Sequence, residues 1–189
     1  KPVLSIDALI TGSLETMRQF ALQSPIDGFT GGNLKRLAVA GDASFRLGLS
    51  VPFANAPATT VDGLLRSNNG TLAVDGLQAP ITDLIGEIAI TREQITGDSL
   101  GGRFLGEEVS FHLAPGDDPR FFAIATATGI ATATGLVEEL GVPLEGLIEG
   151  AAEYEARLLF PRGQQESGTP FTVQVESSLE GLALNFPEP

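Results

Sequence analysis

The chain has 189 residues and a formal net charge of -13, with 11 Lys and Arg side chains against 24 Asp and Glu. This balance argues against nucleic acid as a partner and against electrostatic adsorption to an anionic membrane, because both depend on basic side chains. Cysteine is absent, which excludes disulfides and thiolate metal sites, and no apolar stretch approaches the roughly 18 residues that a membrane-spanning helix needs.

We expect residues 1–189 to form a single β-rich segment, since the length suits one domain and no low-complexity linker interrupts it. The chain begins at Lys1 without an initiating Met, directly before a strand pattern. We therefore expect it to be an internal piece of a longer protein.

The first predicted helix begins after Ser13, a residue type that favours the N-cap. Leu14, Met17 and Phe20 follow at spacings of three residues, so they share one face of a helix. Ser24-Pro25 predicts where this helix ends.

A long strand is predicted over residues 41–52, where apolar side chains alternate with Ser44, Arg46 and Ser50. The same offsets of Gly, Ala, an aromatic residue, Leu and Pro recur over residues 150–161. The two stretches form a possible internal repeat, which is typical of extended or repetitive β architectures.

Turn signals separate the further strands. Asn68-Asn69-Gly70, between Val61–Leu65 and Leu72–Val74, predicts a hairpin, and residues 116–119 predict a second turn. Alternation returns at residues 109–113 and again towards the end of the chain, which gives about nine to eleven strands of ordinary length.

A second short helix is predicted around Leu136, Val137 and Leu140, stopped at Gly141. Two short helices are too few to cover the apolar side of so many one-sided strands, which are typical of antiparallel sheet. That side must either meet a second sheet or remain available to an apolar ligand. Periodicity alone favours a closed β-sandwich or barrel over an open sheet. It does not by itself decide between the closed and the open form.

The sequence offers little catalytic chemistry. The single histidine, His112, lies on the polar side of an alternating strand, and Asp117-Asp118 suits a turn better than a cation site. Neither a nucleophile pair nor a phosphate-binding loop is present. We expect no enzyme activity, no cofactor and no bound metal.

Several segments, in order along the chain, resemble the bacterial AsmA-like (TamB-type) proteins, most closely their YhdP group. They include Leu37–Gly41 leading into Leu47–Phe53, then Leu84–Thr91, Leu140–Pro143, residues 150–161 and Ser177–Pro187. Each motif is made largely of Gly, Pro and Leu, and the strength of the resemblance is its order and coverage. The chain departs from the pattern at Tyr154, where a Trp is expected.

The resemblance implies a mostly β fold, in which a curled antiparallel sheet forms an open hydrophobic groove with two short helices. It also implies a periplasmic segment of a protein anchored in the inner membrane by a part of the protein outside this chain. Such proteins are implicated in moving phospholipids from the inner to the outer membrane. The partners implied are phospholipid acyl chains, neighbouring segments of the same longer chain and an outer-membrane protein.

Under this hypothesis the groove is lined by apolar and aromatic side chains of the alternating strands. The candidate lining residues are Phe45, Leu47, Leu49, Val51, Leu72, Val74, Ile88, Ile90, Val109, Phe111, Leu113, Tyr154, Leu158 and Phe160. Two other functions stay open: a structural scaffold or outer-membrane assembly factor, and a binding module with a closed β-sandwich.

Overall fold

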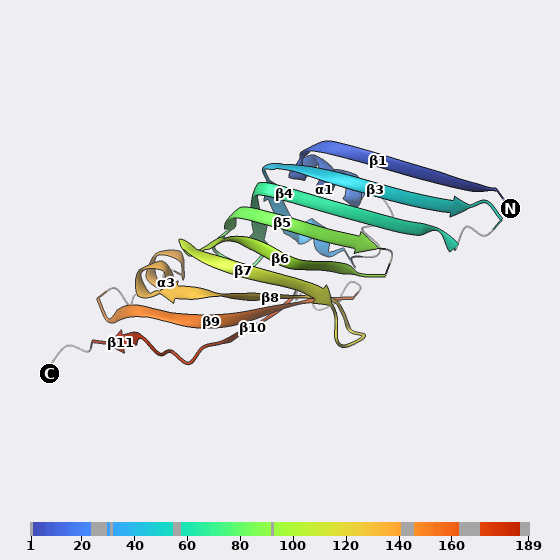
Figure 1. Ribbon diagram of the computed structural model, residues 1–189. Coiled ribbons are helices and arrows are strands. Elements are labelled where there is room, and N and C mark those ends of the chain that lie inside the picture. Colours follow the sequence, from blue (N-terminus) through green and yellow to red (C-terminus); the bar gives the residue numbers. More distant parts are fainter. Residues whose placement is uncertain are drawn as a thin grey trace.

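A single antiparallel β-sheet dominates the computed structural model, which describes residues 2–23, 30, 32–54, 58–91, 93–140, 146–162 and 171–185 (Figure 1). The sheet has 11 strands. They are β1 (Val3–Ser13), β2 (Leu37–Ala40), β3 (Asp42–Pro52), β4 (Thr60–Val74), β5 (Ile81–Thr91), β6 (Ile95–Phe104), β7 (Glu107–Pro115), β8 (Phe121–Thr132), β9 (Ile148–Pro161), β10 (Thr172–Glu176) and β11 (Leu182–Leu184).

The main strands follow one another in the order β1-β3-β4-β5-β6-β7-β8-β9-β10, while β2 pairs with β4 and β11 pairs with β9. From β3 to β9, each strand therefore lies beside its neighbour in sequence. The described sheet ends in two edges, β1 and β10, so it is not closed. The open antiparallel sheet implied by the resemblance is confirmed, and the closed sandwich favoured by periodicity is wrong.

The sheet is not strongly curled, which corrects the shape that the resemblance implied. β1 pairs with β3, and β3 with β4, without a register shift. From β4 to β7, register shifts occur between each pair of neighbouring strands, and they lie along a line that runs diagonally across the sheet. Regular pairing gives a sheet its ordinary twist, whereas sharp bending needs bulges. The visible result is a broad, twisted sheet (Figure 1).

The strand register places one set of apolar side chains on a single side of the sheet, which we call the apolar face. Phe45 lies opposite Leu65, which lies opposite Ile88. Further along, Leu113 pairs with Ala125, and Ala125 with Leu158. Because opposed residues of an antiparallel pair project to the same side, these rows form one surface that runs across the strands.

The other side of the sheet carries the polar partners. Arg66 donates hydrogen bonds to Glu87 there, and the side chain of His112 is 53% exposed, as the sequence predicted for a surface residue. This side is not uniformly polar, because Ile124 and Leu159 face each other on it and both are buried.

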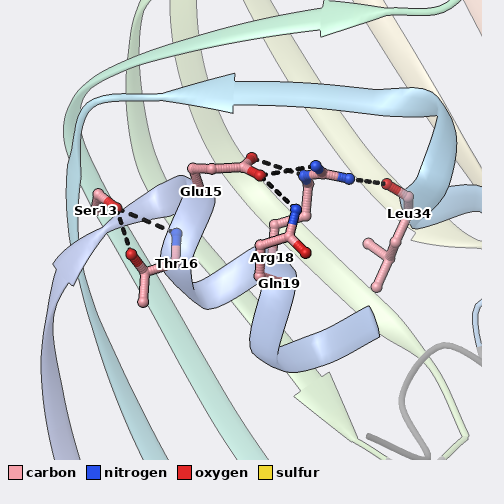
Figure 2. Close-up of polar contacts among 6 residues, drawn as sticks. All are labelled: Ser13, Glu15, Thr16, Arg18, Gln19 and Leu34. Carbon is pink, nitrogen blue, oxygen red and sulfur yellow. Dashed lines mark hydrogen bonds and ion pairs between the residues drawn. The ribbon is translucent and has the colours of Figure 1, made fainter. Parts of the chain in front are cut away.

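Both predicted helices are present. The first, α1 (Leu14–Leu22), begins at Ser13, whose Oγ accepts a hydrogen bond from the Thr16 N–H at 3.1 Å (Figure 2). The second, α3 (Ala133–Leu140), begins directly after β8, where the Thr132 hydroxyl accepts from the Gly135 N–H. The residues predicted to stop the helices, Ser24-Pro25 and Gly141, lie outside the described residues.

The hairpin predicted at Asn68-Asn69-Gly70 is wrong, because β4 runs unbroken through these residues. They instead cause a register shift against β5, between Ser67 and Gly70. Neighbouring irregularities follow at Gly41, at Asp83, which has a φ of 51°, and in β6 between Gly97 and Leu100. Aligned bulges of this kind bend a sheet at a corner. The turn predicted at residues 116–119 is confirmed between β7 and β8.

The bend separates a small corner from the rest of the sheet. We call this corner the flap: the 3₁₀ helix η1 (Asn33–Arg36), β2, and residues 71–81. Its two strands pair through Leu37 with Val74 and through Val39 with Leu72. The flap and α1 are tied together by Arg18, whose Nη1 donates to the Leu34 carbonyl at 3.2 Å (Figure 2).

The two stretches of the possible repeat share a backbone feature. Gly41 and Gly150 have φ angles of 99° and 94°, and a Cβ at either position would collide with a backbone carbonyl, of Asn69 or of Gly181. Only glycine adopts such a conformation next to another chain segment without strain. Gly41 separates β2 from β3, which both pair with β4, and Gly150 pairs with Leu182 of β11. The internal repeat itself stays a prediction.

Candidate functional site: an open apolar face

The structure brings twelve of the fourteen candidate residues together on the apolar face. Each is connected to the others through opposed pairs of neighbouring strands. These residues are Phe45, Leu47, Leu49, Val51, Ile88, Ile90, Val109, Phe111, Leu113, Tyr154, Leu158 and Phe160. Leu72 and Val74 lie in the flap instead, because β4 bends before it reaches them.

The flap residues remain continuous with this surface. Leu72 lies opposite Ile81, and a Cβ at Gly102 would stand 3.0 Å from the Ile81 Cγ2 and 3.6 Å from the Phe111 ring. The flap therefore presents its apolar side chains to the same side of the sheet as the main strands do.

The apolar face is incompletely covered. Only Phe45, Val74 and Val109 among the candidates are buried, and the others are half-buried. No large side chain in the described residues is less than 2% exposed. Side chains between two packed sheets would be close-packed on every side, so this surface differs from the core of a sandwich.

The buried part of the apolar face is formed by side chains of neighbouring strands that pack against one another. Val109, Ala127 and Ala156 form a small cluster on β7, β8 and β9, in which Ala127 lies opposite Ala156 and Val109 lies opposite Gly129, two residues further along β8. Phe111 and Tyr154 pack against it, and the small side chains of β8 leave room for their rings. The cluster fixes the spacing of these strands and leaves the outer surface of its aromatic side chains open.

Among the described residues of the strands, none in the interior of the apolar face is charged. Its few polar groups are the Ser67 hydroxyl, which donates to the Leu84 carbonyl at 3.2 Å, and the phenol of Tyr154. Burial raises the pKa of Tyr154, so the phenol stays neutral at physiological pH. The carboxylate that comes closest to this interior is that of Glu107, which projects to the apolar side from the first residue of β7.

The sequence-based set missed part of this surface. Residues at both edges belong to the same rows and are exposed, namely Ile6 and Ile10 in β1 and Val173 and Val175 in β10. Alternation in residues 4–10 and 171–176 was a sufficient signal for them. Val61, Leu65, Ile95 and Phe104 also lie on the face.

Other candidate chemistry is weak in the described part of the chain. No cluster of His, Asp or Glu there is placed to hold a metal ion. His112 Nδ1 lies 3.4 Å from a carboxylate oxygen of Asp98, with both side chains largely exposed. A shallow depression beside β9 includes Glu155 and Glu176, which face each other as like charges. In that part of the chain, neither of these two carboxylates has a partner that would make one of them a general acid and the other a general base.

A family model described as YhdP protein matches residues 1–189. The chain belongs to the YhdP family. No curated protein and no solved structure is significantly similar to it. Within the described residues, no helix is both long and apolar enough to cross a membrane. The whole-chain match agrees with the order in which the YhdP-like segments occur in the sequence.

Proposed function

We propose that this YhdP-family chain is a segment of a lipid-transfer protein, and that its apolar face shields phospholipid acyl chains between the inner and outer membranes. The observation that carries the proposal is the uncharged, half-buried surface that runs across the sheet from β1 to β10. It functions without catalysis, as a passage rather than an active site. We place it in the periplasm, in a protein anchored in the inner membrane by a segment outside this chain.

The energetics favour such a surface. Two acyl chains contain roughly thirty methylenes, and their exposure to water costs on the order of 25 kcal/mol at about 0.8 kcal/mol for each CH₂. Contact with Leu, Ile, Val and Phe side chains removes much of this cost. A uniform apolar wall also lets a chain slide, because it has no polar pocket that holds one position strongly.

The dimensions also suit this role. Nine strands lie side by side in the main path of the sheet. With neighbours about 4.8 Å apart, the apolar face extends roughly 38 Å across the strands. This is comparable to the roughly 30 Å hydrocarbon thickness of a bilayer. One segment is therefore wide enough to accommodate a full acyl chain.

Photo-crosslinking of the intact protein in cells tests the proposal, with a photoreactive residue at Leu49 or at Ser50. Leu49 lies opposite Val61 on the apolar face, whereas Ser50 lies opposite Thr60 on the other side. Both side chains are half-buried, so exposure alone does not separate them. We expect phospholipid adducts at Leu49 and none at Ser50. Equal labelling, or lipid at neither position in a folded protein, would refute the proposal.

A scaffold or outer-membrane assembly role is the second candidate, and the edge strand β1 favours it. β1 has 11 residues, is largely exposed and carries exposed Leu4, Ile6 and Leu9. Long unpaired edges recruit another strand. If this role is correct, a crosslinker at Leu9 captures a protein, and Leu49 captures no lipid.

A further inference from the structure

The flap makes contacts far across the sheet. The Asn33 Nδ2 donates to the Pro161 carbonyl at 3.0 Å, at the end of β9. On the same side, Phe171 lies beside Phe160, with ring centroids 6.3 Å apart, and a Cβ at Gly76 would stand 3.7 Å from its Cζ. The flap thus meets both β9 and the segment that leads into β10.

These contacts require the flap to cross the apolar face. It leaves the sheet at β4, and β5, β6, β7 and β8 separate β4 from β9. Five strand spacings correspond to roughly 24 Å, which no side chain spans within the plane of the sheet. The crossing is on the apolar side, because the Phe171 ring, which lies close to Gly76 of the flap, packs beside Phe160 of the apolar face.

The crossing divides the apolar face into two bays. The first bay contains Ile6, Leu49 and Val61, which lie in one row of β1, β3 and β4. The second contains Phe111 and Val175, which belong to one row of β7 to β10. An acyl chain that moves from one bay to the other must pass the flap.

Asn33 holds this crossing in place. Its side chain is buried, and its amide donates one hydrogen bond to the Thr30 carbonyl at 2.7 Å and the other to Pro161. Both amide protons are thereby used, and one of the bonds joins residues 128 positions apart. Since a buried amide without partners is costly, the closed position depends on this pairing.

We propose that the flap is a gate between the two bays of the apolar face and that Asn33 is its latch on β9. Opening of the latch is a local event, in which the flap separates from β9 while the strands of the main sheet stay paired. What passes the gate rests on the proposed lipid function; the opening itself does not.

Thiol labelling tests the opening, because the chain contains no cysteine of its own. We would introduce Val74→Cys in the flap or Val109→Cys in the main sheet, two valines that are each 4% exposed. When Asn33→Ala is added, we expect labelling at position 74 to become about tenfold faster, since two hydrogen bonds are lost, and labelling at 109 to stay unchanged. Unchanged labelling at 74, or equal acceleration at both positions, would overturn the gate.

Lipid crosslinking in the intact protein supplies the second readout, with photoreactive residues at Leu49 and at Phe111, one in each bay. We expect Asn33→Ala to shift the ratio of adducts at the two positions by about threefold or more. A faster reaction at position 74 with an unchanged adduct ratio shows a mobile flap that gates nothing, and overturns the proposal. Lipid adducts at neither position in the parent protein would refute the lipid function itself, while the labelling comparison would still decide whether the flap opens.

Discussion

The Phe45 ring packs against Gly63 on the neighbouring strand, and a Cβ at Gly63 would stand 2.9 Å from two atoms of that ring. Because Gly63 has no Cβ, the ring has room to pack there, and it covers backbone of β4 that would otherwise be exposed. Ile90 completes the contact on the far side, with its Cβ 3.4 Å from the same point.

Gly63→Ala should therefore destabilise the fold by about 1–3 kcal/mol, the usual cost of overpacking. Urea unfolding measures the effect. Gly48→Ala is the matched control, because a Cβ there meets nothing closer than 3.6 Å, and its effect should be well under 1 kcal/mol. Equal effects of the two substitutions would contradict the described contact.

The openness of the apolar face predicts unequal costs for truncating two valines. Val109 is buried in the small cluster, whereas Val51 is half-buried on β3. Val109→Ala should lower the free energy of unfolding by about 2 kcal/mol, and Val51→Ala by less than about half of that, since less contact is lost. Denaturant titration of both variants gives the comparison, and a closed core would show similar losses.

A carboxylate on the apolar face should impair lipid contact without unfolding the protein. Leu49→Asp introduces a charge that an acyl chain can approach only at the cost of its desolvation, and we expect at least a roughly tenfold loss of lipid adducts at position 47. Ser50→Asp adds the same charge to the other side of the sheet. Circular dichroism confirms folding of both, and a similar loss of adducts in both would count against a one-sided lipid path.

The N-terminal turn of α1 predicts an acid-sensitive contribution to stability. Hydrogen bonds from Arg18, and next from Gln19, lower the pKa of Glu15 to about 2 from a usual value of 4.5 (Figure 2). Because the folded-state pKa is depressed, this contribution is present above pH 4.5 and is lost as the pH falls towards 2. The difference in unfolding free energy between the parent and Glu15→Gln should therefore shrink across this window. A difference that stays constant from pH 5 to 2.5 would show that the pair does not act on stability.

Much of the fold follows from residue order alone. Alternation placed twelve of the fourteen candidates on one side, since a strand exposes every second side chain to the same face. Ser13 and the spacing of Leu14 and Met17 placed α1. These are local patterns, and the register of an antiparallel pair preserves them across the sheet.

The remaining features depend on distant partners. Asn68-Asn69-Gly70 has the composition of a turn, yet β5 pairs with the runs on both sides of it, which keeps them in one strand with a bulge between them. The same bend carries Leu72 and Val74 away from the main face. Asn33 gave no signal, because its role arises from Pro161, which lies 128 positions away in sequence. Whether the sheet closes could not be predicted from the sequence either, because strands with one apolar face have the same sequence pattern in a sandwich and in an open sheet.

The neighbour-to-neighbour order of β3 to β9 has a consequence for how such a surface grows. Each hairpin pairs with the one before it. The addition or loss of one hairpin, which has two strands, therefore changes the width of the apolar face by roughly 10 Å and leaves the remaining pairings in place. In this architecture, the width of the apolar face is a modular quantity, which duplication of a hairpin changes without rearranging the fold. Most pairings are also close in sequence, so a newly added unit folds against a neighbour that is already present.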